Sequence, residues 1–185
     1  MANVKQIILI SGKRKCGKDY ISEKLQKRLG ESSQIVRISE PIKKEWSKKD
    51  NVGLQELLSD GPLKEKYRKD MIKWGEEVRQ KDYGIFCKLA MDTGTFSETV
   101  IVSDIRRKSD IKYFKEYYNG KVLILRITCP EETRIKRGWI FTQGIDDVES
   151  ECDLDDYEDW DLTVENNGHL DGDEIINLII SKLEL

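Results

Sequence analysis

A glycine- and lysine-rich segment near the start of the chain has the spacing of a phosphate-binding loop. Residues 12–19 read Gly-Lys-Arg-Lys-Cys-Gly-Lys-Asp, which fits G-x-x-x-x-G-K with Asp19 in place of the usual Ser or Thr. In such loops the backbone N–H groups surround a phosphate, the lysine reaches the outer phosphates and the eighth residue faces Mg²⁺. The loop predicts a nucleoside triphosphate site in which Lys18 is the central cation and Asp19 offers a carboxylate.

A second candidate metal ligand follows an apolar run. Residues 100–103 lead into Asp104, the place where phosphate-loop proteins keep an acid that holds Mg²⁺ or its waters. A strand-terminal Asp that caps the following helix has the same pattern, so both interpretations stay open. Arg106 and Arg107 come next, and planar guanidinium groups suit bidentate binding of phosphate or carboxylate. Exposed arginines at a helix start are disfavoured, because a cation there opposes the helix dipole.

A basic stripe is predicted on one long helix, at residues 63–80. One face of this helix is apolar, and a neighbouring face carries Lys64, Arg68, Ile72, Gly75 and Arg79. A glycine inside a helix costs about 1 kcal/mol relative to alanine, which is explained if a ligand approaches the backbone closely. We interpret this face as part of an anion pocket, and a solvated basic face is the alternative. Lys43, which follows the second predicted strand, is expected to line the same pocket.

A cationic segment at about residues 131–146 is interpreted as a short lid. Arg134, Lys136 and Arg137 precede a stretch with glycines at both ends and apolar residues between them. Closing such a lid over phosphates excludes water and neutralises charge on the transferring group. The ten acidic residues from 146 to 161 lack EF-hand spacing and are interpreted as a solvated face.

The elements that position these residues alternate between strands and helices. Strands are predicted at residues 7–10, 35–38, 100–103, 122–127 and 162–164. Helices are predicted at residues 21–29, 41–46, 63–80 and 111–118, with a last helix that Asp173 caps. This order predicts an α/β fold of the P-loop NTPase type: a parallel sheet with helices on both faces and a short lid. The 185 residues suit one domain, residues 1–185.

The charge distribution and the cysteine content of the chain indicate which kinds of ligand and site to expect. Residues 1–137 contain 31 of the 32 Lys and Arg residues against 20 acids, whereas residues 138–185 contain 1 against 15. The excess of basic residues in 1–137 predicts that this part binds anionic ligands.

The four cysteines form no C-x-x-C pair, which disfavours a disulfide framework or a zinc site. The single histidine, His169, is interpreted as a loop side chain. No apolar run approaches the roughly 20 residues that span a bilayer, so a soluble intracellular protein is expected.

Five motifs in this order resemble the animal-type phosphomevalonate kinase family. They are the loop at residues 12–19 and the segments RKDMIKWGEE (68–77), VSDIRR (102–107), RGWIFT (137–142) and VENNG (164–168). The resemblance covers essentially the whole chain and implies a nucleoside-monophosphate-kinase-like fold. It also implies transfer of the ATP γ-phosphoryl group to (R)-5-phosphomevalonate, giving 5-diphosphomevalonate and ADP in the mevalonate route to isoprenoids and sterols. The fungal and plant enzyme of this reaction has the unrelated GHMP fold.

The resemblance assigns expected roles to residues. The ATP phosphates would be held by Lys13, Arg14, Lys15, Cys16, Gly17, Lys18 and Asp19. Arg137 would be the lid arginine on ATP, Asn167 would face the nucleotide and Asn166 the acceptor. The cationic acceptor pocket would be formed by Lys64, Arg68, Arg79, Arg106 and Arg107. The expected metal ligands are Asp19 and Asp104. The expected catalytic residues are Lys18, Asp19 and Arg137, and the expected cofactors are ATP and Mg²⁺.

Rival interpretations share parts of this pattern. A nucleoside or deoxynucleoside monophosphate kinase has the same fold and a similar pocket, but needs base-recognising groups that the sequence does not locate. A GTP-binding switch is disfavoured because no Asn-Lys-x-Asp segment is present. A nucleic-acid-binding ATPase could use the basic part, but aromatic residues are not interleaved with it and the acidic part would repel a polyanion.

The expected partners are therefore ATP and phosphomevalonate, without nucleic acid or membrane, and the expected assembly state is a monomer. The chain ends Leu183-Glu184-Leu185 instead of in a peroxisomal tripeptide of the Ser-Arg-Leu type, which favours the cytosol.

Overall fold

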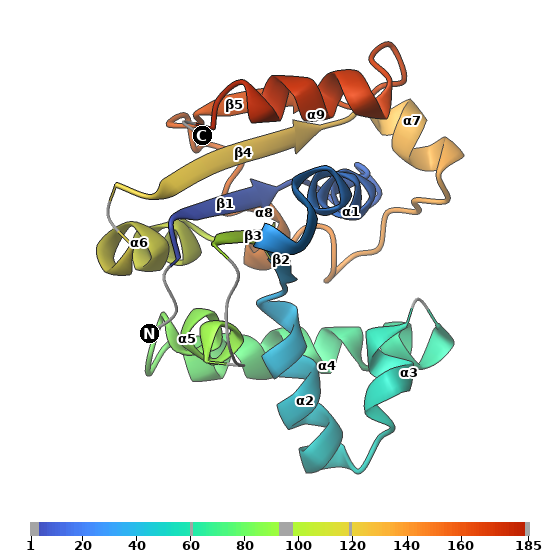
Figure 1. Cartoon of the computed structure of the whole chain (residues 1–185). Coiled ribbons are helices and arrows are strands. Elements are labelled where there is room, and N and C mark those ends of the chain that lie inside the picture. The colour runs from blue at the N-terminus through green and yellow to red at the C-terminus, as the bar shows by residue number, and fades with distance from the viewer. Residues whose placement is uncertain (1–3, 60, 93–97, 119, 184–185) are drawn as a thin grey trace.

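The computed structural model describes residues 4–59, 61–92, 98–118 and 120–183. Its strands form one parallel sheet in the order β2-β3-β1-β4-β5 (Figure 1). They are β1 (Gln6–Ser11), β2 (Ser33–Val36), β3 (Thr99–Ile105), β4 (Val122–Thr128) and β5 (Leu162–Glu165). All five predicted strands are present, and the expected α/β fold is confirmed.

The described residues contain the predicted helices and several shorter ones that were not predicted. They are α1 (Lys18–Leu29), α2 (Ser39–Asp50), α3 (Leu54–Leu58), α4 (Pro62–Arg79), α5 (Ile85–Met91), α6 (Lys108–Tyr117), α7 (Glu131–Lys136), α8 (Glu149–Cys152) and α9 (Gly172–Ile180). A short 3₁₀ turn, η1 (Gly30–Ser32), precedes β2. The sequence did not predict α3, α5, α7 or α8, because elements of four to seven residues are too short to show a helical period.

The cap predicted for the last helix was wrong by two positions. Asp171, not Asp173, accepts hydrogen bonds from the backbone N–H groups of Asp173 at 2.7 Å and Glu174 at 2.8 Å. The Glu174 carboxylate accepts the N–H of Asp171 in return at 2.8 Å. This reciprocal pair is a capping box, which places the cap three residues before the Glu.

Helices cover both faces of the sheet, as expected. On one face Ile8 of β1 belongs to the same core cluster as Ile21 of α1 and Ile176 of α9. On the other face Ile7 belongs to a cluster with Phe86 of α5. Successive residues of a strand point to opposite faces, so a continuous apolar run such as that of β1 indicates burial on both sides.

The helices α2, α3 and α4 form a further layer, in the lower part of Figure 1. Their own small core consists of Trp46, Leu57 and Met71, each from a different one of these helices. Within the described residues no helix combines the length and apolar character needed to cross a bilayer.

Candidate active site

The phosphate-binding loop connects β1 to α1 and takes a backbone shape that its residues explain. Lys15 and Gly17 have positive φ angles of 61° and 91°. A side chain at Gly12 would stand 2.5 Å from the sulfur of Cys16 and 2.6 Å from the carbonyl oxygen of Ile127. Both glycines are therefore required, one by packing and one by conformation. The loop leads directly into the N-terminus of α1, whose N–H groups and dipole attract anions.

Three residues from distant parts of the chain support this loop. Asn166, just beyond β5, donates its side-chain amide to the carbonyl oxygen of Cys16 at 2.9 Å. Arg137 donates from Nη1 to the same oxygen at 3.0 Å and from Nη2 to the carbonyl oxygen of Asn166 at 3.1 Å. Arg134 donates to the carbonyl oxygen of Arg14 at 2.8 Å. The lid segment and the end of β5 thus lie directly against the loop.

Lys18 is buried at the start of α1, with 7% of its surface exposed. Burial lowers the pKa of its ammonium group, and the nearby Arg106 guanidinium lowers it further. The carboxylates of Asp19 and Asp104 act in the opposite direction. A buried cation that is short of counter-ions has a strong attraction for a phosphate.

Asp104 adopts a role that the sequence did not predict. Its carboxylate accepts the backbone N–H groups of Ile38 at 2.7 Å and Ser39 at 3.0 Å. It therefore caps the start of α2 rather than the helix that follows it in sequence. The strand β2 ends at Val36, two residues before its predicted end at Ile38.

The predicted metal ligands differ in surroundings. Asp19 is exposed in the first turn of α1, whereas Asp104 is buried. Mg²⁺ is held in kinases by one or two carboxylates together with substrate phosphates and waters, a donor set that these two side chains fit. Within the described ranges, no three His, Cys, Asp or Glu side chains gather closely enough to hold a metal without such phosphates.

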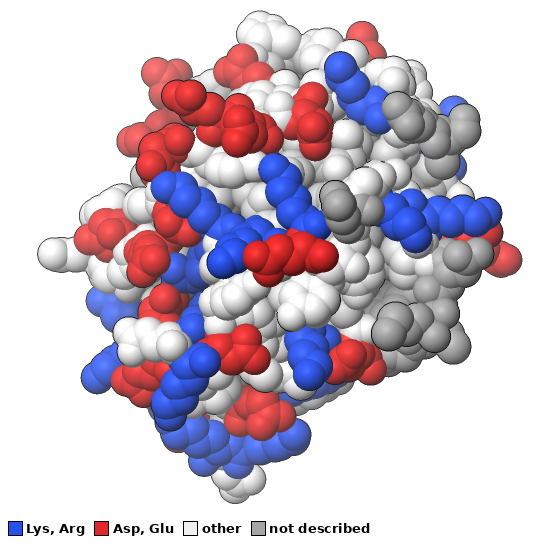
Figure 2. Space-filling model, turned by 90° about the vertical axis from the view of Figure 1, so that its left-hand side faces the viewer, with Lys and Arg blue, Asp and Glu red and all other residues white. Residues whose placement is uncertain are grey.

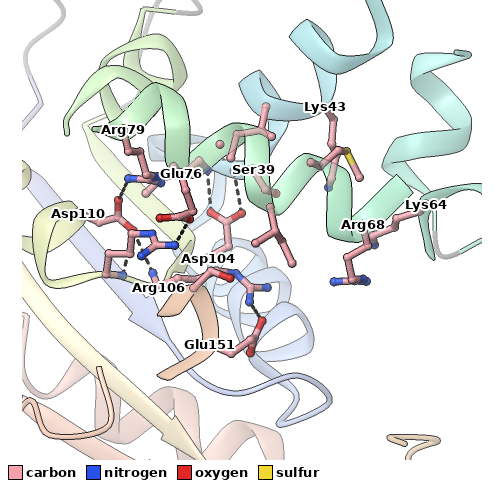
Figure 3. A pocket seen from close by; sticks show the side chains of 17 residues that line it. Ser39, Lys43, Lys64, Arg68, Glu76, Arg79, Asp104, Arg106, Asp110 and Glu151 are labelled. Atoms are coloured by element: carbon pink, nitrogen blue, oxygen red, sulfur yellow. Dashed lines mark hydrogen bonds and ion pairs between the residues drawn. The ribbon is translucent and has the colours of Figure 1, made fainter. Parts of the chain in front are cut away.

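A pocket lies between α2, α4 and the carboxyl end of β3 (Figure 3). The structure brings six predicted acceptor residues together in its lining: Lys43, Lys64, Arg68, Arg79, Arg106 and Arg107. The apolar part of the lining includes Ile42, Met71 and Ile72. Asn166, the seventh predicted acceptor residue, is not among the residues that line this pocket, because its side chain is held against the phosphate loop.

Carboxylates neutralise part of this cationic pocket. Arg79 pairs with Asp110 at 2.7 Å, Arg107 pairs with Glu76, and Arg106 pairs with Glu151 of α8. Figure 3 shows Arg79, Asp110 and Glu76 at one end of the pocket. Lys43, Lys64 and Arg68 lie at the other end, and Arg106 lies between the two groups. Burial raises the pKa of Glu76, and the Arg107 guanidinium opposes that shift.

The acidic segment at residues 146–161 is only in part the solvated face that the sequence predicted: seven of its ten acids are exposed, but Asp146, Glu151 and Asp153 are not. Asp146 pairs with Arg14 of the phosphate loop at 2.8 Å, and Asp155 pairs with Lys13 at 2.6 Å. Asp146 and Glu151 each expose only 5% of their side chains. The interpretation was wrong for Asp146 and Glu151, because their counter-ions, Arg14 and Arg106, lie more than 40 positions earlier in the chain, where a reading of neighbouring residues cannot find them.

The pKa of Lys43 is lower than that of an ordinary lysine. Burial, assisted by the positive charge of Lys64, lowers its pKa to about 8. At neutral pH Lys43 still carries its charge, but a nearby anion would stabilise that charge considerably.

The lid segment, about residues 131–146, lies at the edge of the sheet beside the phosphate loop (Figure 1). Gly138 and Gly144 have positive φ angles of 80° and 77°. Between them Trp139 is buried under Arg134, whose guanidinium lies 4.0 Å from its ring, while Ile140 and Phe141 are exposed. The lid is thus anchored by Trp139 and presents two apolar side chains to solvent.

On the face shown in Figure 2, basic and acidic side chains are interspersed over the middle and lower parts, and acidic ones gather toward the upper left.

Comparison with known proteins adds sequence and structural relatives. A family model described as phosphomevalonate kinase matches residues 10–120. A phosphomevalonate kinase from Drosophila melanogaster is 56% identical over 185 residues, which covers 97% of this chain and 97% of that protein.

Solved structures resemble the fold at low sequence identity. A gluconokinase from Sinorhizobium meliloti 1021 superimposes with a TM-score of 0.52 and 12% identity, covering 97% of this chain and 92% of that one. A shikimate kinase from Acinetobacter baumannii in complex with shikimate gives a TM-score of 0.51 and 12% identity, covering 99% and 97%. These structures show a fold shared with P-loop kinases of small molecules.

Proposed function

The chain belongs to the phosphomevalonate kinase family and is a phosphotransferase of the mevalonate pathway, and we propose that it transfers the γ-phosphoryl group of ATP to (R)-5-phosphomevalonate. The products would be 5-diphosphomevalonate and ADP. The observation that carries this proposal is the convergence of six cations in one pocket next to the phosphate loop. A substrate with a phosphate at one end and a carboxylate at the other needs cations at both ends of its site.

The nucleotide half of the proposed site is the loop of residues 12–19. Its backbone would surround the β-phosphate, and Lys18 would neutralise charge on the γ-phosphate. Arg137 and Asn167 would lie on the nucleotide side. The hydrogen bonds of Arg137 to the loop support this assignment, because they hold a guanidinium beside the phosphates.

The acceptor half uses Arg106 as the link between the two substrates. Burial lowers the pKa of Arg106, and the electrostatic neighbours that act on it include Asp104, Arg68, Asp19 and Arg14. Arg106 is therefore within reach of both the loop and the pocket, and we assign it to the acceptor phosphate. Lys43, Lys64 and Arg68 would bind at one end of the acceptor, and Arg79 and Arg107 at the other.

Binding would proceed by exchange of partners. Glu151 now neutralises Arg106, and Asp146 neutralises Arg14. An incoming phosphate carries up to two charges and three acceptor oxygens, so it can replace a carboxylate on a guanidinium. The cost of separating each ion pair is returned by the new one.

No general base is required for this reaction. The nucleophile is an oxygen of a phosphate monoester, whose second pKa of about 6 leaves it largely dianionic at pH 7. The main obstacle is repulsion between two polyanions. Preorganised cations in a site with little water reduce that repulsion most in the transition state, where charge spreads over the transferring group.

Asp19 and Asp104 are the residues that would hold Mg²⁺. When bound there, Mg²⁺ would neutralise part of the charge on the ATP phosphates. Asp104 already accepts two backbone N–H groups, so its contribution would come through the remaining lone pairs of its oxygens.

Compartment and assembly are further parts of the proposal. Four cysteines without a disulfide suit the reducing cytosol. Both halves of the proposed site are built from one chain, which is compatible with a monomer.

The test is an ADP-release assay with ATP and Mg²⁺ that compares (R)-5-phosphomevalonate with a panel of nucleoside monophosphates. Turnover with phosphomevalonate alone supports the proposal. Turnover with a nucleoside monophosphate instead would reassign the acceptor pocket and leave the loop assignments standing.

A further inference from the structure

The helix α4 presents a regular stripe to the acceptor pocket. Lys64, Arg68, Ile72, Gly75 and Arg79 all line the pocket, with helical spacing. Four of these residues have long side chains, and the fifth has none. Gly75 lies well inside the 18-residue helix, where glycine is less favourable than alanine.

Neither conformation nor packing in the structure requires a glycine at this position. Gly75 is not among the glycines with a positive φ angle, so an L side chain is allowed there. An added Cβ would stand 3.9 Å from Cδ1 of Ile42 and 4.0 Å from Cε2 of Phe86, which are ordinary van der Waals distances. Gly12, in contrast, could not carry a Cβ without a collision.

The space left by the missing side chain belongs to the apolar middle of the pocket. Gly75 is one turn from Met71 and faces Ile42 of α2, and both residues line the pocket. Figure 3 shows Arg79 on one side of the pocket and Lys43 on the other, with Asp104 and Arg106 between them. An acceptor with two anionic ends would therefore place its carbon skeleton along this wall.

We propose that Gly75 is a specificity-determining residue that makes room for the methyl-bearing C3 carbon of the acceptor. This inference rests on the proposed function. A carbon that bears both a methyl and a hydroxyl group is wider than one that bears the hydroxyl alone, and a helix wall without a Cβ lets it approach the backbone. An alanine methyl at position 75 would occupy the same volume as part of the substrate.

The experiment compares Gly75→Ala with the wild type on two acceptors. One is (R)-5-phosphomevalonate and the other is its analogue without the C3 methyl, 3-hydroxy-5-phosphopentanoate. We expect the KM for phosphomevalonate to rise about tenfold or more, because the alanine methyl group would occupy space that the substrate needs, and one extra methyl group in a closely packed pocket has an effect of that order. The KM for the smaller analogue should change less than threefold, and the KM for ATP should not change.

Thermal melting and a control variant accompany the kinetics. Gly75→Ala should melt at or above the wild-type temperature, since alanine favours the helix and the added Cβ meets no close neighbour. Lys73→Ala changes an exposed residue of the same helix and should leave both acceptor KM values unchanged. Gly75→Ser, with a slightly larger side chain, should raise the KM for phosphomevalonate at least as much as alanine does.

Several outcomes would overturn the inference. An unchanged KM for phosphomevalonate in Gly75→Ala would mean that no part of the substrate lies near this position, and an equal rise for both acceptors would mean that the methyl is not what Gly75 accommodates. A marked drop in melting temperature would show that packing requires the glycine. If the wild type does not turn over phosphomevalonate in the same assay, the proposed function itself fails, and the inference fails with it.

Discussion

Arg137 and Asn166 both donate a hydrogen bond to the carbonyl oxygen of Cys16, at 3.0 Å and 2.9 Å. The lid segment and the end of β5 thus fix the same peptide of the phosphate loop. A methyl group at Gly17 would collide with the amide of Asn166, so the contact leaves no spare room.

Asn166→Ala tests this relationship. We expect the KM for ATP to rise several-fold, because one of these two hydrogen bonds to the carbonyl oxygen of Cys16 is lost, and the KM for the acceptor to stay within about twofold. Loss of one buried hydrogen bond should lower the free energy of unfolding by about 1 kcal/mol. Steady-state kinetics with each substrate varied in turn provide the measurement. If only the acceptor KM changed, Asn166 would contact the acceptor, as the resemblance implied.

Lys18→Met should lower kcat by about a hundredfold or more and leave the acceptor KM nearly unchanged. The reason is that Lys18 would stabilise charge on the transferring group, which is greatest in the transition state. Lys27→Met on the exposed side of the same helix is the control. A kcat equal to that of the wild type would remove Lys18 from the proposed mechanism.

Arg106→Gln should raise the acceptor KM by about tenfold to a hundredfold, as expected for loss of one charged hydrogen-bonding group to phosphate. The same kinetic experiment with ATP varied should show a much smaller change. An acceptor KM within twofold of the wild-type value would contradict the assignment of Arg106 to the acceptor.

Glu151→Gln should have the opposite effect on the acceptor. Without its carboxylate, Arg106 has no competing anion to release, so the acceptor KM should fall several-fold. The melting temperature should fall as well, because a partly buried guanidinium loses its counter-ion. Glu158→Gln, an exposed acid of the same segment, is the control. A higher acceptor KM in Glu151→Gln would mean that Glu151 orients Arg106 in the complex instead of competing for it.

The lowered pKa of Lys43 predicts that acceptor binding depends on pH. Its pKa is lowered to about 8, so its charge is lost as the pH rises through 8, well below the usual range of lysine. We expect the acceptor KM to rise severalfold between pH 7 and pH 9. In Lys43→Arg this rise should be absent, because arginine keeps its charge. A profile identical in both proteins would exclude Lys43 as the titrating group.

The same shift has a consequence for stability. Between pH 8 and about 10.5 the unfolded chain holds a proton on Lys43 that the folded chain has lost, so this group makes the free energy of unfolding increase with pH in that window.

The loop and the α4 stripe could be predicted because both are local patterns. A G-x-x-x-x-G-K segment between an apolar run and a helix, or Arg68 and Arg79 on one helical face, requires no knowledge of distant residues. The partners of these residues could not be predicted in this way. Asp104 caps a helix 66 positions earlier in the chain, and Asn166 meets Cys16 across 150 positions.

The acidic segment shows the same limit most clearly. From the sequence, Asp146 and Glu151 have no nearby cations, and a solvated surface was the natural expectation. Glu151 lies in α8, a helix too short to leave a periodic signal, and Asp146 is held by Arg14 from the distant phosphate loop. The sequence did contain one usable hint, the excess of acids beyond residue 137 opposite an excess of bases before it.

The most direct test of the proposed site is a structure of the protein with (R)-5-phosphomevalonate and a non-hydrolysable ATP analogue. Our account predicts the acceptor phosphate on Arg106, with Glu151 released, the γ-phosphate analogue on Lys18, and the C3 methyl of the acceptor against Gly75. An acceptor bound outside the pocket between α2 and α4, or a complex in which Glu151 still neutralises Arg106, would contradict it.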